Sequence, residues 1–179
     1  MLTLITPCCR PQNLAKIKES IQFDKIQRWI IVYDTTKNRT YEKQFEHPQI
    51  EEVFCDAIGI SGNQQRNFGA AMVSEGHIYF VDDDNIVHPE FWTLTFEPAF
   101  FYTFDQLRNK SGHVLRGSRF HHGQIDTAMF VVPKSMWIDW NPNKYEADFL
   151  FISQINRKFG KHAKYFNKIA CYYNYLTSF

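Results

Sequence analysis

The feature that most constrains the fold is an alternation of strand and helix patterns over the first part of the chain. Short apolar runs rich in strand-forming residues occur at residues 2–6, 29–33, 52–55 and 77–81. Helical patterns lie between the first and second runs and between the third and fourth. Strands and helices that alternate at this spacing form parallel sheets with right-handed crossovers. We therefore predict an α/β, Rossmann-like fold with a mostly parallel central sheet flanked by helices.

Particular residues mark the ends of the two predicted helices. Pro11 suits the first turn of a helix, where its missing N–H costs nothing. Ser61, with Gln64 three residues later, matches a capping box. The second helix is therefore predicted to begin after Ser61 and to end near Gly76.

The second half of the chain is less regular and rich in aromatic residues. A helical region is predicted from His88 and is interrupted by Pro98. The other predicted elements are strands at residues 114–117, 125–132 and 169–173 and a helix at residues 146–159. A length of 179 residues, a hydrophobic content of 44% and the lack of repeats or linkers predict one domain over residues 1–179.

The composition argues against several partners and compartments. Twenty basic and nineteen acidic residues are interspersed, without a Lys/Arg run, so we expect no nucleic-acid partner. No stretch approaches the roughly 20 apolar residues of a membrane span, so no integral membrane segment is expected. The four cysteines (Cys8, Cys9, Cys55 and Cys171) lack the spacing of a metal or disulfide motif, which favours a reducing compartment. We expect a cytoplasmic protein, free or peripheral to a membrane.

Three consecutive carboxylates, Asp82, Asp83 and Asp84, follow the apolar run at residues 77–81. Open parallel sheets bind ligands at the carboxyl ends of their strands, which is where this triplet is expected. Adjacent carboxylates repel one another, and Mg²⁺ or Mn²⁺ relieves that repulsion with one or two carboxylates plus phosphate oxygens and water. Alternate residues of an extended segment face the same way, so Asp82 and Asp84 can converge on the cation. A solvated acidic turn, or a helix cap, is the alternative.

Residues 78–85 read Ile-Tyr-Phe-Val-Asp-Asp-Asp-Asn. This segment resembles the DXD motif of glycosyltransferases with the GT-A fold. Further segments in the expected order resemble the large inverting family that includes bacterial polysaccharide glycosyltransferases. These segments contain Thr6, Pro7, Arg10, Asp34 and the sequence Gln65-Arg66-Asn67-Phe68-Gly69.

The resemblance implies a role for each of these segments. It places Thr6, Pro7, Arg10, Asp34, Arg66, Asp82 and Asp83 in the nucleotide-sugar donor site. It makes Asp84, with Asp82, the ligand of Mn²⁺ or Mg²⁺. On this basis residues 1–92 form a donor half and residues 93–179 an acceptor half that carries the catalytic base.

The base is expected near the start of the last predicted helix. An inverting transfer needs a carboxylate that deprotonates the acceptor hydroxyl. In the family an E-D pair opens this helix and its Asp is the base, whereas this chain has Tyr145-Glu146-Ala147-Asp148. The resemblance therefore assigns Asp148 as the base, with Glu146 as its rival. Acidic residues are also favoured at helix N-termini on structural grounds alone, and this is the alternative reading for both.

Several other side chains have both a functional and a structural interpretation. Residues 125–133 resemble the family's segment that lines the donor sugar. His121 and His122, beside Asp126, admit a metal or phosphate contact, but adjacent histidines on a turn are more often surface residues. Trp92, Trp137 and Trp140 can stack on sugar rings, although core packing is the default for tryptophan.

The implied function is metal-dependent transfer of a sugar from a nucleoside-diphosphate sugar, with a UDP-sugar favoured, to a hydroxyl group with inversion. The acceptor is a glycan, a lipid-linked or a protein-linked molecule. A sugar-nucleotide nucleotidyltransferase is one alternative, although residues 8–11 contain no glycine, unlike the Gly-rich loop typical of that class. A nucleotide-sugar-binding module without turnover is the other.

Overall fold

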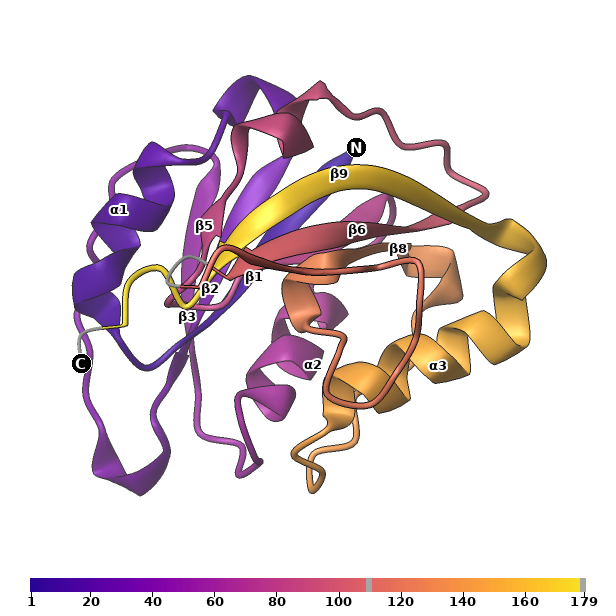
Figure 1. Ribbon diagram of the computed structural model, residues 1–179. Helices are drawn as coiled ribbons and strands as arrows, with labels where there is room; N and C mark the ends of the chain where they lie inside the picture. Colours follow the sequence, from indigo (N-terminus) through magenta and orange to yellow (C-terminus); the bar gives the residue numbers. More distant parts are fainter. Residues whose placement is uncertain (109–110, 178–179) are drawn as a thin grey trace.

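The computed structural model describes residues 1–108 and 111–177 (Figure 1). Its strands are β1 (Leu2–Cys8), β2 (Arg28–Asp34), β3 (Ile50–Cys55), β4 (His77–Phe80), β5 (Ile86–Val87), β6 (Phe101–Arg108), β7 (His113–Leu115), β8 (Phe130–Pro133) and β9 (Ala163–Tyr173). Its α-helices are α1 (Leu14–Glu19), α2 (Asn63–Ala71) and α3 (Ala147–Phe159). Within these residues no helix is long and apolar enough to cross a membrane.

The strands form one sheet in the order β3-β2-β1-β4-β8-β6-β9-β5, with β7 paired to β6. The first four strands of this order are parallel, whereas β8 is antiparallel to both β4 and β6. Parallel pairing brings the carboxyl ends of β1 to β4 to one edge of the sheet. The predicted α/β fold with helices around a central sheet is confirmed; the sheet is mixed, with its main parallel block at the N-terminal end of the chain.

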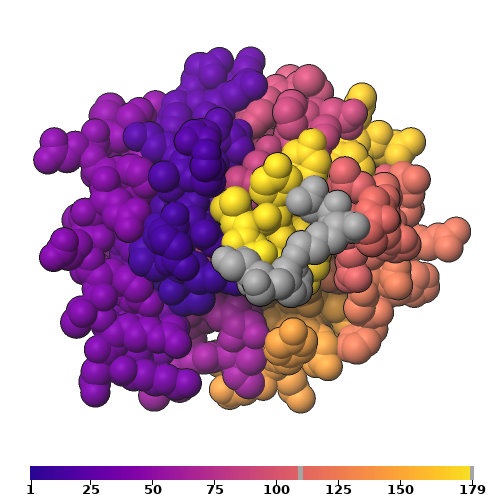
Figure 2. Space-filling view, turned by 60° about the vertical axis from the view of Figure 1, so that its left-hand side comes forward, coloured from indigo at the N-terminus to yellow at the C-terminus, as the bar shows by residue number. Residues whose placement is uncertain are grey.

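The core lies on both faces of the sheet because successive strand residues point to opposite sides. Leu4, Trp29 and Ile31 pack towards α1, whereas Ile5 and Ile30 pack towards α2 and α3. The N-terminal and C-terminal parts of the chain occupy different sides of the molecule (Figure 2). Side chains from both parts can therefore meet only where these sides adjoin.

Helix α2 packs closely on the sheet because Gly69 has no side chain. A Cβ at this position would lie 2.7 Å from Ile5 Cγ2 and 3.1 Å from Val32 Cγ2. The close contact holds α2 against β1 and β2, and it fixes the position of Arg66 one turn earlier in the helix.

The predicted start of α2 was wrong. Gly62, not Ser61, is the N-cap, and no side chain caps the helix. Ser61 and Gly62 have positive φ angles of 53° and 76°, so this loop turns in the left-handed region before the helix begins. A Cβ on Gly62 would lie 2.9 Å from Pro7 Cβ, which shows how closely the turn passes over the end of β1. The helix ends at Ala71, earlier than the predicted stop near Gly76.

The predicted elements of the second half also need correction. The helical region from His88 is a short 3-10 helix (Pro89–Thr93), and it is followed by β6, which was not predicted. Residues 101–106 are all buried, so β6 lacks the apolar–polar alternation that reveals a half-exposed strand. The strand predicted at residues 125–132 is shorter in the structure. Asp126 caps a 3-10 turn, and the strand, β8, begins only at Phe130. Strand β9 begins at Ala163, earlier than predicted.

We predict that Gly69→Ala lowers the free energy of unfolding by about 1–3 kcal/mol, because the new methyl group overpacks the contact with Ile5 and Val32. Urea denaturation followed by circular dichroism measures the change. Gly160→Ala is the control, because Gly160 has a helical φ of −58° and should change stability by less than about 1 kcal/mol. Equal effects of the two substitutions would contradict this account of how α2 is seated.

Candidate active site

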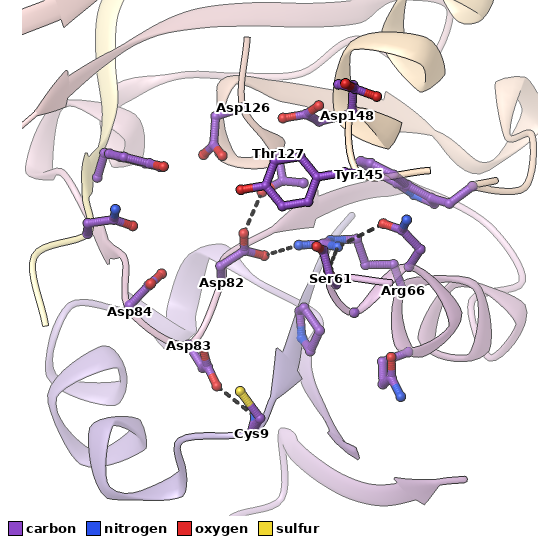
Figure 3. Close-up of a pocket in the computed structure, with 18 of the residues that line it drawn as sticks. Cys9, Ser61, Arg66, Asp82, Asp83, Asp84, Asp126, Thr127, Tyr145 and Asp148 are labelled. Carbon is purple, nitrogen blue, oxygen red and sulfur yellow. Dashed lines mark hydrogen bonds and ion pairs between the residues drawn. The ribbon is translucent and has the colours of Figure 1, made fainter. Parts of the chain in front are cut away.

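A cavity of about 630 Å³ lies at the carboxyl edge of the parallel strands (Figure 3). Its wall combines the ends of β1, β2 and β4 with the start of α2, residues 122–123 and 125–127, the start of α3 and the end of β9. The residues predicted for the site that line it are Pro7, Arg10, Asp34, Arg66, Asp82, Asp83, Asp84, Glu146 and Asp148. The cavity therefore brings residues of the predicted donor and acceptor halves together.

Thr6 is the predicted site residue that does not line the cavity. Its side chain is fully buried, and Trp29 Nε1 donates a hydrogen bond of 2.9 Å to its Oγ1. Thr6 therefore faces the core, and its hydroxyl is already engaged by the protein.

Asp83 ties the loop after β1 to the end of β4. Its Oδ2 accepts hydrogen bonds of 2.7 Å from both Cys9 N and Arg10 N, and its Oδ1 accepts from Arg10 Nε at 2.8 Å and from Arg10 Nη2 at 2.5 Å. Figure 3 shows its carboxylate pointing away from Asp82 and Asp84, as the alternation of side chains predicts. Both oxygens are thus used to hold the loop in place.

Asp82 is fixed by two partners from different parts of the chain. Its Oδ1 forms an ion pair of 2.5 Å with Arg66 Nη2, and its Oδ2 accepts a 2.9 Å hydrogen bond from Thr127 Oγ1. Both contacts are visible in Figure 3. Thr127 belongs to the C-terminal part of the chain, so Asp82 is one of the points at which the two parts are joined.

Helix α2 makes three separate contacts through the sequence Gln65-Arg66-Asn67-Phe68-Gly69. Arg66 pairs with Asp82, and Gly69 permits the close approach to β1. Asn67 exchanges hydrogen bonds with the backbone of Trp140, at 3.0 Å to its carbonyl and 2.8 Å from its N–H. Asn63 adds bonds to the carbonyls of Asn141 and Lys144. Helix α2 therefore positions the loop that leads into α3 and Asp148.

Asp84 faces the cavity, and its negative charge is only partly neutralised by the protein. Arg10 Nη2 lies 2.9 Å from its Oδ2, but this guanidinium is shared with Asp83. Burial, followed by the nearby Asp82 carboxylate, raises the pKa of Asp84 to about 6, although Arg10 opposes the shift. A group with this environment gains from an additional positive charge in the cavity.

Asp148 and Glu146 occupy different environments. Burial, with a further contribution from Asp82, raises the pKa of Asp148 to about 6, while the N–H of Phe149 and the charge of Arg66 oppose the shift. Glu146 is exposed, and its Oε1 lies 3.3 Å from His122 Nε2. Hydrogen bonds at its own backbone and from His122 lower the pKa of Glu146. Asp148 is therefore the carboxylate with the greater proton affinity near neutral pH.

Asp126 also faces this space, although the sequence indicated it only as a neighbour of His121 and His122 and as part of residues 125–133, which resemble the segment that lines the donor sugar. Its Oδ2 accepts a 2.6 Å hydrogen bond from the buried amide of Gln106. Burial, followed by Asp82, raises the pKa of Asp126 to about 7, and Asp148 adds to the shift. In the structure Asp126 caps the 3-10 turn at Thr127–Met129, and the fold brings it beside Asp82 and Asp148.

The end of β9 also contributes to the wall in a way that the sequence does not reveal. Tyr173 and Asn174 line the cavity. Asn174 N donates to Asn85 Oδ1 at 2.8 Å, and Leu176 N donates to the carbonyl of Asp84 at 3.0 Å. The last described turn of the chain is therefore anchored directly to the acidic segment.

Asp34 and Trp140 are engaged mainly in contacts within the protein. Asp34 lines the cavity and accepts hydrogen bonds from Thr36 N, Gln65 Nε2 and Arg39 Nη1. Trp140 is buried and stacks on Phe151 with ring centroids 4.5 Å apart, which agrees with core packing. Its other face meets Arg66, whose guanidinium carbon lies 5.1 Å from the ring centroid.

The cavity wall carries an excess of negative charge. Its lining includes seven carboxylates and three arginines. Among residues 1–108 and 111–177, no group of three or more Asp, Glu, His or Cys side chains is arranged to hold a metal ion by itself. Asp82 and Asp84 fit a cation site whose other ligands are water and the oxygens of a phosphate group, as is usual for Mg²⁺.

Comparisons with known proteins bear on the fold. No protein-family model matches the sequence, and no curated protein matches it. The structure of residues 1–349 of S. aureus TarS has a TM-score of 0.65 at 12% identity, over 96% of this chain and 59% of that one. The inositol-1-phosphate CTP transferase from T. maritima has a TM-score of 0.50 at 10% identity, over 95% of this chain and 86% of that one.

This chain thus spans 59% of the length of the TarS structure. A second TarS structure gives the same TM-score of 0.65, at 11% identity and over 36% of that chain. At these identities the likeness concerns the fold alone, which is an α/β fold of the GT-A and nucleotidyltransferase type.

We predict that Asp126→Asn stabilises the metal-free protein at pH 8 but not at pH 4.5. An Asp in the unfolded chain loses its proton near pH 4, whereas Asp126 in the folded protein retains it to about pH 7. The contribution of Asp126 to stability therefore falls as the pH rises from about 4 to 7, and an uncharged side chain avoids this loss.

Thermal melts in the presence of a chelator test this prediction. The melting temperature of the variant should exceed that of the natural protein by roughly 3–6 °C at pH 8, and the gain should vanish at pH 4.5. The matched control is Asp24→Asn, because Asp24 is exposed and its substitution should give the same small difference at both pH values. A gain that does not depend on pH would contradict the assigned environment of Asp126.

Proposed function

We propose that the protein transfers a sugar from a nucleoside-diphosphate donor to a hydroxyl acceptor, with a divalent cation bound at the acidic segment. The observation that carries this proposal is the convergence of Arg66, Asp82, Asp84 and Asp148 on one cavity at the carboxyl edge of the sheet. These residues come from three distant segments, and the fold brings them together at the edge where open parallel sheets bind ligands.

The charge of the cavity supports a cation-dependent donor site. A nucleoside diphosphate is itself anionic, and it is repelled by a wall with more carboxylates than arginines. Asp84 and Asp82 would hold Mn²⁺ or Mg²⁺, which would neutralise the diphosphate and stabilise it as the leaving group. Asp34, at the end of β2, is suited to accept hydrogen bonds from the base or ribose, and Arg10, which lies near Asp84, would contact the phosphates.

Asp148 is the candidate base. Its carboxylate is mostly ionised at neutral pH, yet burial gives it a higher proton affinity than an exposed Asp. A base must take a proton from the acceptor hydroxyl while that oxygen attacks the anomeric carbon, and a pKa near 6 suits this task at neutral pH. Direct displacement of this kind inverts the configuration at that carbon.

The fold likeness to a CTP transferase keeps nucleotidyl transfer as the second candidate. The turn after β1 distinguishes the two functions, because a triphosphate cradle typically requires a glycine-rich loop there. Here residues 8–11 contain no glycine, and Asp83 holds the turn through its backbone N–H groups. Sugar transfer is therefore the better-supported function.

The test is release of nucleoside diphosphate from UDP-, GDP- and dTDP-sugars in the presence of Mn²⁺. We expect release from at least one donor and expect Asp84→Asn to abolish cation-dependent donor binding. Asp148→Asn should bind the donor within about twofold of the natural protein, yet lower transfer by about 10²–10⁴-fold, as expected for loss of a general base. Asp24→Asn serves as the exposed control and should behave as the natural protein does.

Other outcomes would replace this proposal. Release of pyrophosphate from a nucleoside triphosphate and a sugar phosphate would identify a nucleotidyltransferase. Tight, cation-dependent donor binding without release of any product would indicate a binding module. If Asp148→Asn turns over normally and Glu146→Gln is inactive, the base is Glu146.

A further inference from the structure

One of the three arginines in the cavity wall has no carboxylate of the protein as a partner. Arg10 and Arg66 both form ion pairs with aspartates of the acidic segment. The third, Arg108, is exposed at the end of β6. Within the part of the chain that the structure describes, no carboxylate lies within ion-pair distance of Arg108. Its positive charge is therefore available to a ligand in the cavity.

The pairing of β6 with β9 directs Arg108 towards the cavity. Gln106 of β6 lies opposite Cys171 of β9, and Gln106 Nε2 donates to Cys171 Sγ at 3.0 Å. The same amide donates to Oδ2 of Asp126, which lines the cavity. Two residues further along the strands, Arg108 lies opposite Tyr173. Because alternate residues of a strand share a face, Arg108 and Tyr173 continue this face to the edge of the sheet, where both line the cavity.

Tyr173 holds the guanidinium group of Arg108 in place. The guanidinium carbon lies 5.3 Å from the centroid of the Tyr173 ring, within the range of a cation–π contact. Such a contact uses the face of the ring and none of the five N–H donors of the guanidinium. An arginine held in this way can still form the two parallel hydrogen bonds with which arginine binds a carboxylate.

The rest of the cavity wall repels an anionic ligand. Seven carboxylates line the cavity, and none of the described lysines does. A ligand carboxylate that enters this space loses hydration and meets like charges, so it needs a cation as a partner. Arg108 is the arginine of the wall that can supply this partner without giving up an ion pair within the protein.

The position of Arg108 in the sheet separates it from the part of the cavity proposed for the nucleoside. Strands β4 and β6 end at the same edge, because both are antiparallel to β8. In the strand order, β6 lies four positions from β2, which carries Asp34. At roughly 4.8 Å between neighbouring strands, this separation is on the order of 20 Å. A group bound by Arg108 therefore belongs to the sugar end of the donor or to the acceptor.

We infer that Arg108 and Tyr173 form a subsite for a carboxylate carried by a sugar, which is either the transferred sugar or a sugar of the acceptor. The inference rests on the proposed function, and it narrows the substrate class to acidic sugars. Arg108 forms a bidentate pair with the carboxylate, and Tyr173 keeps the guanidinium in position. A neutral sugar lacks this interaction and leaves the charge of Arg108 without a partner.

Binding of matched acidic and neutral ligands tests the inference without knowledge of the natural acceptor. The donor pair is UDP-glucuronate and UDP-glucose, and the acceptor pair is tetragalacturonate and its methyl ester. Isothermal titration calorimetry in the presence of Mn²⁺ gives each affinity. In at least one pair, the natural protein should bind the acidic member about tenfold more tightly than the neutral one, as expected for a charge-assisted hydrogen-bonded pair.

Three variants and a control identify the source of this preference. Arg108→Gln should reduce the preference to about twofold or less, and Arg108→Lys, which keeps the charge without the planar fork, should retain part of it. Tyr173→Leu removes the ring and should lower the preference by about two- to fivefold. Arg119→Gln is the matched control, because Arg119 is exposed and lines a separate hollow beside β7. It should leave the preference as it is in the natural protein.

The ligand pair in which Arg108→Gln removes the preference shows whether the carboxylate belongs to the transferred sugar or to the acceptor. The inference is overturned if the natural protein prefers neither acidic ligand, or if Arg108→Gln and Arg119→Gln have the same effect. It is also overturned if Arg108→Gln weakens binding of UDP as much as that of UDP-glucuronate, since Arg108 would then contact the diphosphate.

A failure of the proposed function gives a different result. Absence of Mn²⁺-dependent UDP binding by the natural protein would refute the proposed donor site. The preference for tetragalacturonate over its methyl ester, measured without nucleotide, would then decide whether the carboxylate subsite exists. Its dependence on Arg108 would support the subsite, and its absence would overturn it.

Discussion

The mutual repulsion of carboxylates around one cavity is the constraint on which the rest of the site depends. Asp82, Asp84, Asp126 and Asp148 face a shared space, and burial, with a smaller contribution from the charge of Asp82, raises the pKa of the other three to about 6 or 7. Two arginines reduce the electrostatic repulsion between these carboxylates, since Arg66 pairs with Asp82 and Arg10 binds both Asp83 and Asp84. The negative charge that remains favours binding of a divalent cation, which can in turn bind a nucleotide.

Helix α2 links this electrostatic arrangement to the fold. Gly69 seats the helix on β1, which directs Arg66 towards Asp82 and Asn67 towards the loop before α3. The donor and base candidates are thereby positioned by one short helix. The turn that follows β9 contributes to the cavity wall and is held by hydrogen bonds to Asn85 and to the carbonyl of Asp84. Rigid secondary structure therefore holds groups that are far apart along the chain.

The sequence predicts the parallel part of the sheet well because each strand is a short apolar run between helical patterns. It fails at β6, since a strand buried on both faces shows no alternation, and at Ser61, where a left-handed turn replaces the expected cap. Asp82 could be assigned to the cavity because it follows an apolar strand, and the family resemblance assigned Asp34 and Arg66. Thr6 could not, because its burial depends on Trp29, and Asp126 could not, because only tertiary contacts bring it beside Asp82.

The most direct test of the central claim is the binding of Mn²⁺ to the natural protein, followed by electron paramagnetic resonance at pH 7.5 with and without UDP. Without UDP, two carboxylates should hold the ion only weakly, because the described residues contain no group of three or more Asp, Glu, His or Cys side chains arranged around a metal ion. The account predicts that UDP increases the affinity for Mn²⁺ at least tenfold, and that Mn²⁺ increases the affinity for UDP by the same factor, as reciprocal linkage requires. Equal Mn²⁺ affinity in the presence and absence of UDP would contradict it.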